Sequence, residues 1–412
     1  MFRLSHWCYV FLISASGMAH AGDVLSIQEA TVLALTRHPL TAAIQSELRA
    51  AEGLQQQAAY RPNPELEAGV GRKETDTDSG YAVDVTVAVP VERKGKREAR
   101  IGIAESERAV AEAAAAELRR DVELQVRTLA YEWLSASADA GIAQEIAERS
   151  RAMIELLKQR PVAGPAMLLE LQIIEASLVE FQKSAREFSA QRDIARRNLN
   201  LLLGRAPDAP LELKDTLDVP ATTYSLDALM QQLDHNPGLL KRLAEAKRAL
   251  HEVEAARAEA RPDYYLAPYI SREEAGEEET TIGLAVQLPL AWRNRNQGAM
   301  AAASARHAAA EAQVAAGLLE ARSEIARVHR LYEAAVEQVN AISPELVARL
   351  HDAADLADRQ YRLGAIPVNL FLDMQREFLS VQLLRRNALL DALKKQAELR
   401  WISADGRQEG VR

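Results

Sequence analysis

The chain carries two copies of one sequence pattern, and this duplication restricts the possible folds more than any other feature. Four landmarks recur at a spacing of 198 to 200 residues, which is the mark of an internal structural repeat. The landmark pairs are Pro39 with Pro237, Pro62 with Pro262, Pro90 with Pro289, and Gly164 with Gly364. We therefore predict two repeats at residues 22–203 and 224–404, joined by a linker at 204–223 and followed by a polar tail at 405–412.

Each repeat contains segments that predict a β-hairpin, at residues 64–90 and 264–289. In "YAVDVTVAV" (81–89), apolar side chains alternate with small or polar ones, and "TIGLAVQL" (281–288) alternates in the same way. This period of two is typical of a strand with one apolar and one polar face. The segments between the strands, "KETDTDSG" and "EEAGEEE", are polar and predict turns.

A long helix should follow each hairpin. The run between Pro90 and Pro161 has no proline, so a helix that rises ~1.5 Å per residue would reach on the order of 100 Å. Its apolar positions recur at a mean spacing of about 3.67 residues, which favours straight helices that stand side by side. Each long helix should end at a break that contains proline and glycine, after which a second helix returns. Aromatic residues make up only 5% of the chain, in agreement with helices packed through small side chains.

The first 21 residues predict a secretory signal peptide. They combine one arginine, an apolar core and the small-x-small ending Ala19-His20-Ala21, after which we expect cleavage. The only cysteine, Cys8, lies in this segment, so we expect no disulfide, no thiolate metal site and no lipid anchor in the exported chain. No later stretch approaches the ~18 apolar residues that a membrane-spanning helix needs.

Net charge and motifs argue against several function classes. The formal net charge is −9 and the pI is about 5.6, which argues against a nucleic-acid partner. The six histidines after the signal peptide show no pair at ligand spacing, and we expect neither a metal site nor a cofactor. The sequence lacks a nucleophile elbow, a phosphate loop and a dinucleotide fingerprint, so we expect no enzyme activity.

The strand count predicts assembly from several copies. Strands of about nine residues have the length that crosses a bilayer at a tilt, but four strands do not close into a barrel. Open edges in lipid would leave backbone groups unpaired, at a cost of several kcal/mol each. Three copies would supply about twelve strands, an even number that can close around a pore. Two or four copies are the alternatives that this arithmetic leaves open.

The duplicated layout resembles that of the TolC-type outer-membrane efflux family. The segments that carry the likeness are "RPNPELEAGVG" (61–71), "VPVERKGKREAR" (89–100) and "YRLGAIPVNLFLD" (361–373). "RPNPEL" and "GKREAR" are most similar to the CzcC-like branch of this family, which serves heavy-metal RND efflux. The resemblance covers nearly the whole chain after the signal peptide. It implies a mainly α fold with a small β part: a homotrimer whose 12-stranded outer-membrane β-barrel continues into a long periplasmic α-helical barrel.

The resemblance also implies a function and partners. The chain would be the exit duct of a tripartite efflux system in a Gram-negative bacterium, for cations such as cobalt, zinc, cadmium, nickel, copper or silver. Its partners would be a periplasmic adaptor protein, an inner-membrane RND pump and outer-membrane lipid. A duct for drug efflux or type I protein secretion is an alternative of the same class. A soluble periplasmic coiled-coil scaffold and, more remotely, an envelope-bound hydrolase are alternatives of other classes.

Two groups of candidate residues lie at or near the breaks between helices. The breaks should form hairpin tips, and the resemblance implies that these tips dock the adaptor and gate the duct. The candidate tip residues are Arg160, Gly164, Arg362, Leu363 and Gly364. Just inside the tips, three-fold symmetry would turn Glu170 and Asp373 into rings of carboxylates that favour cations. The alternatives are simple turns and carboxylates that face outward.

A third group of candidates follows the hairpins, where side chains can reach lipid phosphates at the membrane boundary. These basic residues are Arg93, Lys94, Lys96, Arg97, Arg100, Arg293 and Arg295. The alternative is that they form the solvated start of a helix.

Overall fold

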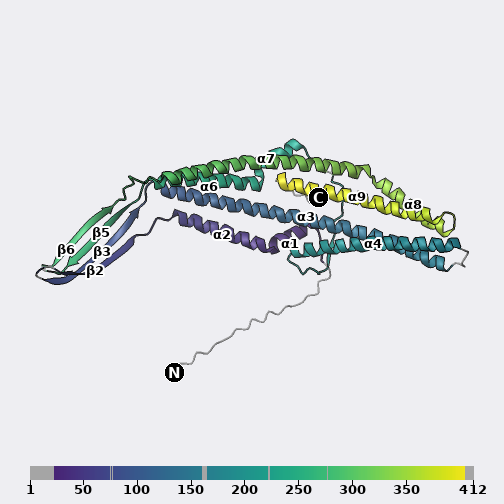
Figure 1. Ribbon diagram of the computed structural model, residues 1–412, viewed down its shortest axis with the longest axis horizontal. Helices are drawn as coiled ribbons and strands as arrows, with labels where there is room; N and C mark the ends of the chain where they lie inside the picture. The colour runs from purple at the N-terminus through teal and green to yellow at the C-terminus, as the bar shows by residue number, and fades with distance from the viewer. Residues whose placement is uncertain are drawn as a thin grey trace, which may run out of the picture.

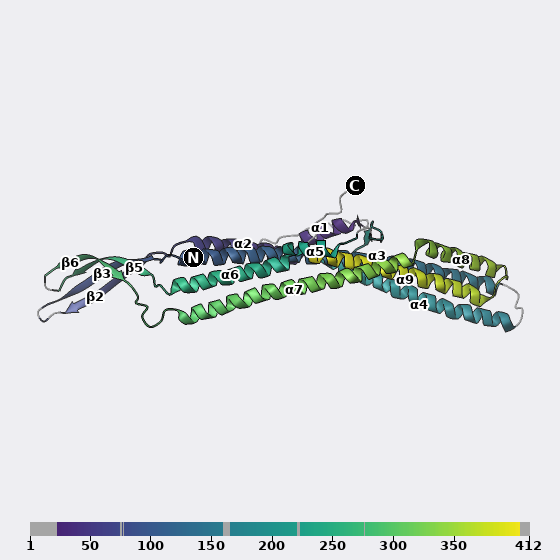
Figure 2. The same cartoon turned by 90° about the horizontal axis from the view of Figure 1, so that it is seen from above.

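The protein is elongated, with a β-sheet at one end and helices along the rest of its length (Figures 1 and 2). The structure is a computed structural model that describes residues 23–74, 76, 78–159, 165–220, 223–275 and 277–403. The expected signal peptide at 1–21 and the tail at 405–412 lie outside the described residues, as do Arg160 and Gly164.

Each sequence repeat folds into helices on both sides of a β-hairpin. The first repeat comprises β1 (Asp23–Leu25), α1 (Ile27–Arg37), α2 (Pro39–Ala59), β2 (Glu65–Glu74), β3 (Ser79–Val91), α3 (Lys96–Lys158) and α4 (Pro165–Leu202). The linker contains β4 (Leu211–Leu213). The second repeat comprises α5 (Leu226–Gln231), η1 (Gln232–His235), α6 (Pro237–Glu259), β5 (Tyr264–Glu273), β6 (Glu279–Gln287), α7 (Gln297–Ala341), α8 (Pro344–Arg362) and α9 (Val368–Ser403).

The two hairpins join into one antiparallel sheet with the order β2-β3-β5-β6. The chain therefore forms four strands in this sheet, as the alternating patterns predicted. The strands are 10, 13, 10 and 9 residues long. A second, two-stranded parallel sheet pairs β1 with β4 and ties the beginning of the first repeat to the linker. The sequence patterns gave no sign of this short pairing.

The long helix that the absence of proline predicted is α3. It runs without interruption for 63 residues, or about 95 Å at the helical rise. The second repeat was expected to match it, and this prediction was wrong. α7 ends at Ala341, and α8 begins at Pro344 with Ser343 as its N-cap. A proline at the first helical position needs no backbone N–H donor, so the chain can start a new helix there.

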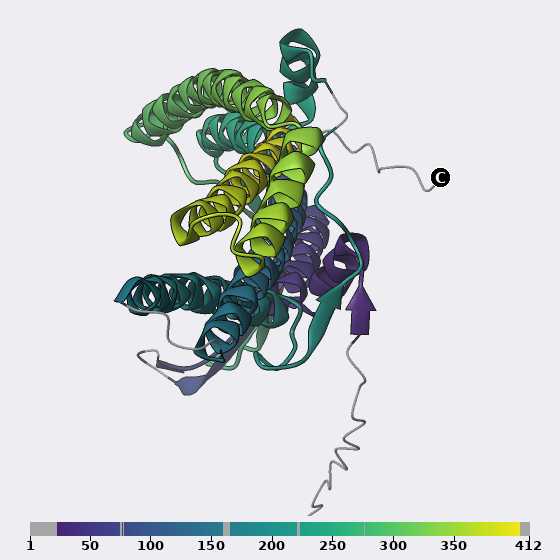
Figure 3. The same cartoon turned by 90° about the vertical axis from the view of Figure 1, so that its right-hand side faces the viewer.

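α3 is the central helix of the molecule. It packs between α2 and α6 near the sheet and against α4 and α9 toward the other end (Figures 1 and 3). Near the sheet the helices stand side by side in the order α2, α3, α6, α7. Among the described helices, none is long and apolar enough to cross a membrane.

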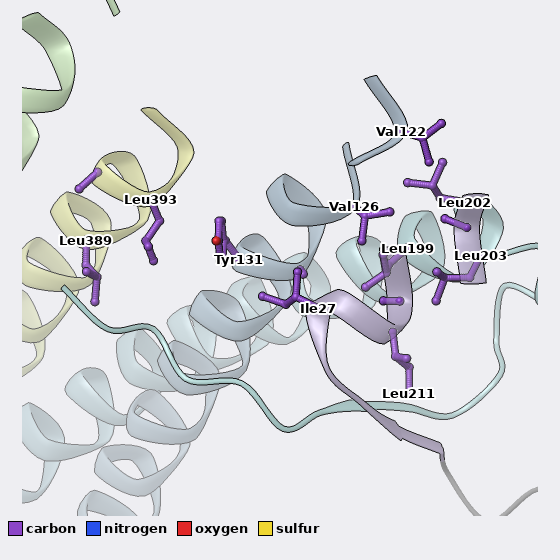
Figure 4. Packing of buried hydrophobic residues seen from close by; sticks show 14 of the residues in the cluster. Ile27, Val122, Val126, Tyr131, Leu199, Leu202, Leu203, Leu211, Leu389 and Leu393 are labelled. Atoms are coloured by element: carbon purple, nitrogen blue, oxygen red, sulfur yellow. The ribbon is translucent and has the colours of Figure 1, made fainter. Parts of the chain in front are cut away.

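Three clusters of buried apolar side chains hold the helices together. The first joins α1, α3, α4, α7, α9 and the linker, and Figure 4 shows Val126, Leu199 and Leu203 close together in it. The second lies among α3, α4, α8 and α9 and includes Phe181 and Phe371. The third packs α5, α6, α7 and the end of α9. None of the three clusters, all built from described residues, includes a side chain of the four-stranded sheet.

Candidate functional site

One face of the four-stranded sheet carries an exposed apolar band. The register pairs Leu66 with Val87 and Ile270 with Ile282, so alternate residues of neighbouring strands meet on the same side. Ile282 is 79% exposed. The band consists of Leu66, Val70, Val83, Val85, Val87, Val89, Leu266, Ile270, Ile282, Leu284 and Val286. A continuous apolar surface of this kind marks contact with lipid or another protein.

The opposite face of the sheet is polar. Asp84 is paired with Gly69 on one side and Ser271 on the other. A Cβ atom on residue 69 would lie 2.4 Å from the Asp84 Oδ1 atom, so glycine makes room for this carboxylate. Further polar side chains on this face are Glu65, Glu67, Thr86, Thr281 and Gln287. Carboxylates, hydroxyls and amides suit a water-filled side, whereas the apolar band suits lipid.

The sheet has two open edges. Within the described chain, β2 pairs only with β3 and β6 pairs only with β5. Each edge strand therefore presents a row of backbone N–H and C=O groups that another strand can pair with.

Lys96, one of the candidate lipid-contacting residues, is buried within the chain. Its Nζ atom lies 2.9 Å from Glu259 Oε2 and 3.0 Å from Asp263 Oδ2. Burial lowers the pKa of the ammonium group, but the hydrogen bonds to both carboxylates outweigh burial, and the pKa is raised overall. The three side chains join the start of α3 to the end of α6, so Lys96 serves the contact between repeats.

Two other members of the basic group also bind within the chain. The guanidinium carbon of Arg93 lies 5.2 Å from the centroid of the Tyr264 ring, a cation–π arrangement. Arg100 donates to Glu92 Oε1 at 2.6 Å and to the Tyr60 carbonyl at 3.0 Å. The rest of the group is Arg97, which is half-buried, and Lys94, Arg293 and Arg295, which are exposed. The exposed members remain the candidates for contact with lipid phosphates.

The turn between α8 and α9 lies at the end of the molecule farthest from the sheet (Figure 1). Gly364 has a φ of +74°, in the left-handed region that favours glycine. Leu363 beside it is 78% exposed. Arg362 donates from Nε to Asp358 Oδ2 at 2.8 Å, which holds its guanidinium along α8. The described part of this tip therefore presents an apolar side chain on a tight turn.

The two carboxylates near the tips have different surroundings. Glu170 of α4 accepts a hydrogen bond from the Tyr361 hydroxyl at 3.1 Å, which links α4 to α8. The Asp373 side chain is 64% exposed and lies 3.7 Å from Arg376. Arg376 also lies 3.1 Å from Glu180 and so links α9 to α4. The sequence gives no sign of these cross-links, because the partners are 191 and 196 residues apart.

A buried ion pair joins the two repeats through the long helix. Asp139 of α3 accepts a hydrogen bond from Arg386 Nη1 of α9 at 2.6 Å, and the two side chains are 7% and 15% exposed. Among the described residues, no group of three or more His, Cys, Asp or Glu side chains is placed to hold a metal ion.

Comparisons with known proteins point to one family. The model of the outer membrane efflux protein family matches residues 30–205, nearly all of the first repeat. The cobalt-zinc-cadmium resistance protein CzcC of Cupriavidus metallidurans is 27% identical over 279 residues, which are 68% of this chain and 66% of that protein.

Solved structures share the fold over nearly the whole chain. The outer membrane protein VceC of Vibrio cholerae has a TM-score of 0.75 at 21% identity, covering 93% of this chain and 97% of VceC. CusC has a TM-score of 0.72 at 17% identity, with 94% and 95% coverage. The open state of the Neisseria gonorrhoeae MtrE channel has a TM-score of 0.74 at 16% identity, with 94% and 90% coverage. The fold is therefore TolC-like in both repeats.

Proposed function

This chain belongs to the outer membrane efflux protein family, and on that premise we propose that three copies form an exit duct through the outer membrane. The observation that carries the proposal is the four-stranded sheet with an apolar band, a polar face and two open edges. In a trimer, edge would pair with edge, the band would face lipid and the polar side would face water. A soluble scaffold would instead leave the band in water.

The helices would carry the duct into the periplasm. α3 alone extends about 95 Å from the sheet, about three times the ~30 Å thickness of the hydrocarbon core of a bilayer. We place the tip at Leu363 and Gly364 against a periplasmic adaptor protein, and the adaptor against an inner-membrane pump of the RND type. The exposed leucine and the tight turn support this placement, because an apolar side chain at the end of a long polar rod suits a protein contact.

We propose heavy-metal cations as the substrate. The relative named for cobalt, zinc and cadmium resistance supports this choice. The exposed Asp373 would form a ring of three carboxylates if it faces the lumen of a trimer, and such a ring favours cations. Asp373→Asn should then lower the cation preference of reconstituted single channels. Unchanged selectivity would place Asp373 on the outside of the duct.

The placement of the sheet in lipid is tested by two neighbouring positions on β6. Ile282 lies on the apolar band and Thr281 on the polar face. Ile282→Arg should cost about 2–4 kcal/mol of membrane insertion and deplete the trimer from outer-membrane fractions. Thr281→Arg is the matched control, because the same side chain would enter the lumen and be tolerated. If both variants are tolerated equally, the sheet does not lie in the membrane.

The substrate class is tested in cells that lack this chain. Such cells should accumulate cobalt, zinc or cadmium when these ions are supplied, and the wild-type chain should reverse the accumulation. Ile282→Arg should fail to reverse it and Thr281→Arg should succeed. If an organic dye accumulates in place of the metals, the chain is a duct for drugs.

A further inference from the structure

The duplication allows a comparison between two equivalent linkers, each leading from a strand to a long helix. In the first repeat, the linker from β3 to α3 docks on the segment just before and at the start of β5. The Arg93 backbone N–H donates to Asp263 Oδ1 at 2.8 Å, and its Nε donates to the Pro262 carbonyl at 3.4 Å. Its guanidinium also covers the Tyr264 ring. Each of these contacts joins the first repeat to the second.

The linker from β6 to α7 in the second repeat is held only within its own repeat, where Asn296 Nδ2 donates to the Ala256 carbonyl of α6 at 2.9 Å. Among the described residues it makes no hydrogen bond to the first repeat. Both linkers end at a residue of left-handed conformation, Gly95 (φ +99°) and Asn296 (φ +61°), which caps the following helix. Counted from Pro90 and Pro289, Trp292 takes the place of Arg93. Yet Trp292 is 76% exposed. An indole left in water at this position indicates a missing neighbour.

The segment equivalent to Pro262–Tyr264 lies 200 positions earlier, at Pro62–Pro64, and it is also uncovered. It adjoins β2, whereas Trp292 follows β6, at the opposite edge of the sheet. Beside this segment, α2 and α3 border a groove of about 380 Å³. Its lining includes Leu54, Ala58, Tyr60, Pro62, Arg100 and Glu107. Tyr60 is 65% exposed.

We propose that the linker from β6 to α7 of one copy docks in this groove of the next copy, with Trp292 against Tyr60 and Pro62. The docking rests on the proposed trimer, in which β6 of one copy pairs with β2 of the next. That pairing would bring the two uncovered segments together, as the pairing of β3 with β5 brings Arg93 to Pro262 and Tyr264 within one chain.

The chemistry of the two surfaces is complementary. The indole would cover the proline and tyrosine rings, and the Arg100 guanidinium in the groove can lie against an aromatic face. Asn63 stands where the second repeat has Asp263. The Trp292 backbone N–H already donates to the Leu290 carbonyl at 3.0 Å, so the carboxamide oxygen of Asn63 would accept from the indole N–H of Trp292. The groove thus offers both an apolar wall and a hydrogen-bond acceptor.

The same contact cannot form within a single chain. β2 and β6 are separated by β3 and β5, and at a strand spacing of ~4.8 Å the edges lie about 14 Å apart. A disulfide requires Cα atoms within about 4.4–6.8 Å. A cross-link between positions 63 and 292 therefore reports contact between copies.

The test uses two full-length chains with different affinity tags, produced in the same cells. One chain carries Asn63→Cys and the other carries Trp292→Cys; both positions are exposed in the single chain, so folding should be unaffected. Oxidation should link the two tags into one covalent dimer. The matched control replaces Trp292→Cys with Leu319→Cys. Leu319 is 67% exposed and lies about 33 Å from the start of α7 along the helix, so this variant should give no link.

The oligomeric mass in detergent is measured on the same samples, so that two kinds of failure can be told apart. A trimer without the 63–292 link would overturn the docking and leave the proposed duct intact. A monomer would overturn both. Equal linking in the Leu319→Cys control would mean random collision and would also overturn the docking. A second variant, Trp292→Phe, should retain the thermal stability of the trimer, whereas Trp292→Ala should lower it.

Discussion

The two long helical segments that follow the hairpins come from duplicated sequence, but one is continuous and the other is divided. The division, at residues 342–343 between α7 and α8, is called the joint below. α3 continues through Ala143 and Gln144 for 63 residues. At the equivalent positions of the second repeat, Ser343 and Pro344 end one helix and begin the next. The hydroxyl of Ser343 accepts a hydrogen bond from the Leu346 N–H at 3.2 Å, as expected for an N-cap. Serine and proline thus provide a helix start in the second repeat at the place where the first repeat continues its helix.

The joint is supported from outside the helix. Arg385 of α9 donates from Nη1 to the Val339 carbonyl at 3.0 Å and to the Ile342 carbonyl. These carbonyls lie at the end of α7, where backbone acceptors lack partners within the helix. The next residue, Arg386, pairs with Asp139 of the unbroken helix. Arg385 therefore binds α9 to the joint, and Arg386 binds α9 to α3.

The largest effect on stability should come from breaking the ion pair that links α3 to α9 of the second repeat. Asp139→Ala leaves the Arg386 guanidinium buried without its counter-charge, and we expect a loss of about 3–5 kcal/mol in unfolding free energy. The measurement is the urea midpoint of the detergent-solubilised protein, followed by helical circular dichroism.

Arg386→Met in the same chain is the control for this first prediction. The double variant Asp139→Ala/Arg386→Met should recover much of the loss, because no unpaired charge then remains in the interior. If the single and double variants unfold at the same urea concentration, the lost stability comes from packing and the ion pair is not the link.

A proline introduced into α3 at the position equivalent to Pro344 should interrupt this helix as the second repeat is interrupted. Gln144→Pro deletes one backbone hydrogen bond in the interior of α3 and clashes with the preceding turn, at a cost of about 3 kcal/mol or more. The same measurement applies, and Gln144→Ala at this exposed position should change little. Pro344→Gln should also change little, because the first helical position needs no donor. A small effect of Gln144→Pro would mean that α3 tolerates a joint as readily as α7.

Much of the fold could be predicted from local sequence patterns. The alternation at Tyr81–Val89 and Thr281–Leu288 predicted strands, and the run without proline predicted α3. The break at Pro344 was also visible as a proline after serine, but the duplication led us to expect two equal helices. A repeat in sequence fixes the common architecture, whereas a single proline decides whether a particular helix continues.

The candidate site was less predictable, because most of its contacts join distant residues. Lys96 lies within a basic run that is typical of a membrane boundary, yet its partners Glu259 and Asp263 lie 163 and 167 residues away. The link from Tyr361 to Glu170 spans 191 residues. Local patterns identify residue types and exposed ends of helices. They do not show which charged side chains pair once the two repeats have packed together.

The beginnings of the repeats differ in the same way as the long helices, through a few residues that alter a helix end. Ser26 and Glu29 form a complete capping box at the start of α1. At the equivalent positions the second repeat has Ser225 and Ala228, and the Ser225 side chain makes no capping hydrogen bond. Glu29 therefore gives the first repeat a helix start that the second repeat lacks.

The smallest of the predicted effects is a pH-dependent one at this capping box. The pKa of the Glu29 carboxyl is lowered to about 2, because it accepts hydrogen bonds from the Ser26 backbone N–H and from the Lys214 ammonium. A lowered pKa in the folded state stabilises the fold above the ordinary pKa of 4.5 and loses this contribution as the pH falls toward 2. Glu29→Gln should therefore lower the thermal midpoint at pH 7, with a difference from wild type that narrows below pH 4.5. Ala228→Glu should add the missing partner to Ser225 and slightly raise the midpoint at pH 7. A constant difference between Glu29→Gln and wild type down to pH 2 would show that the carboxylate charge does not contribute to the stability of this helix start.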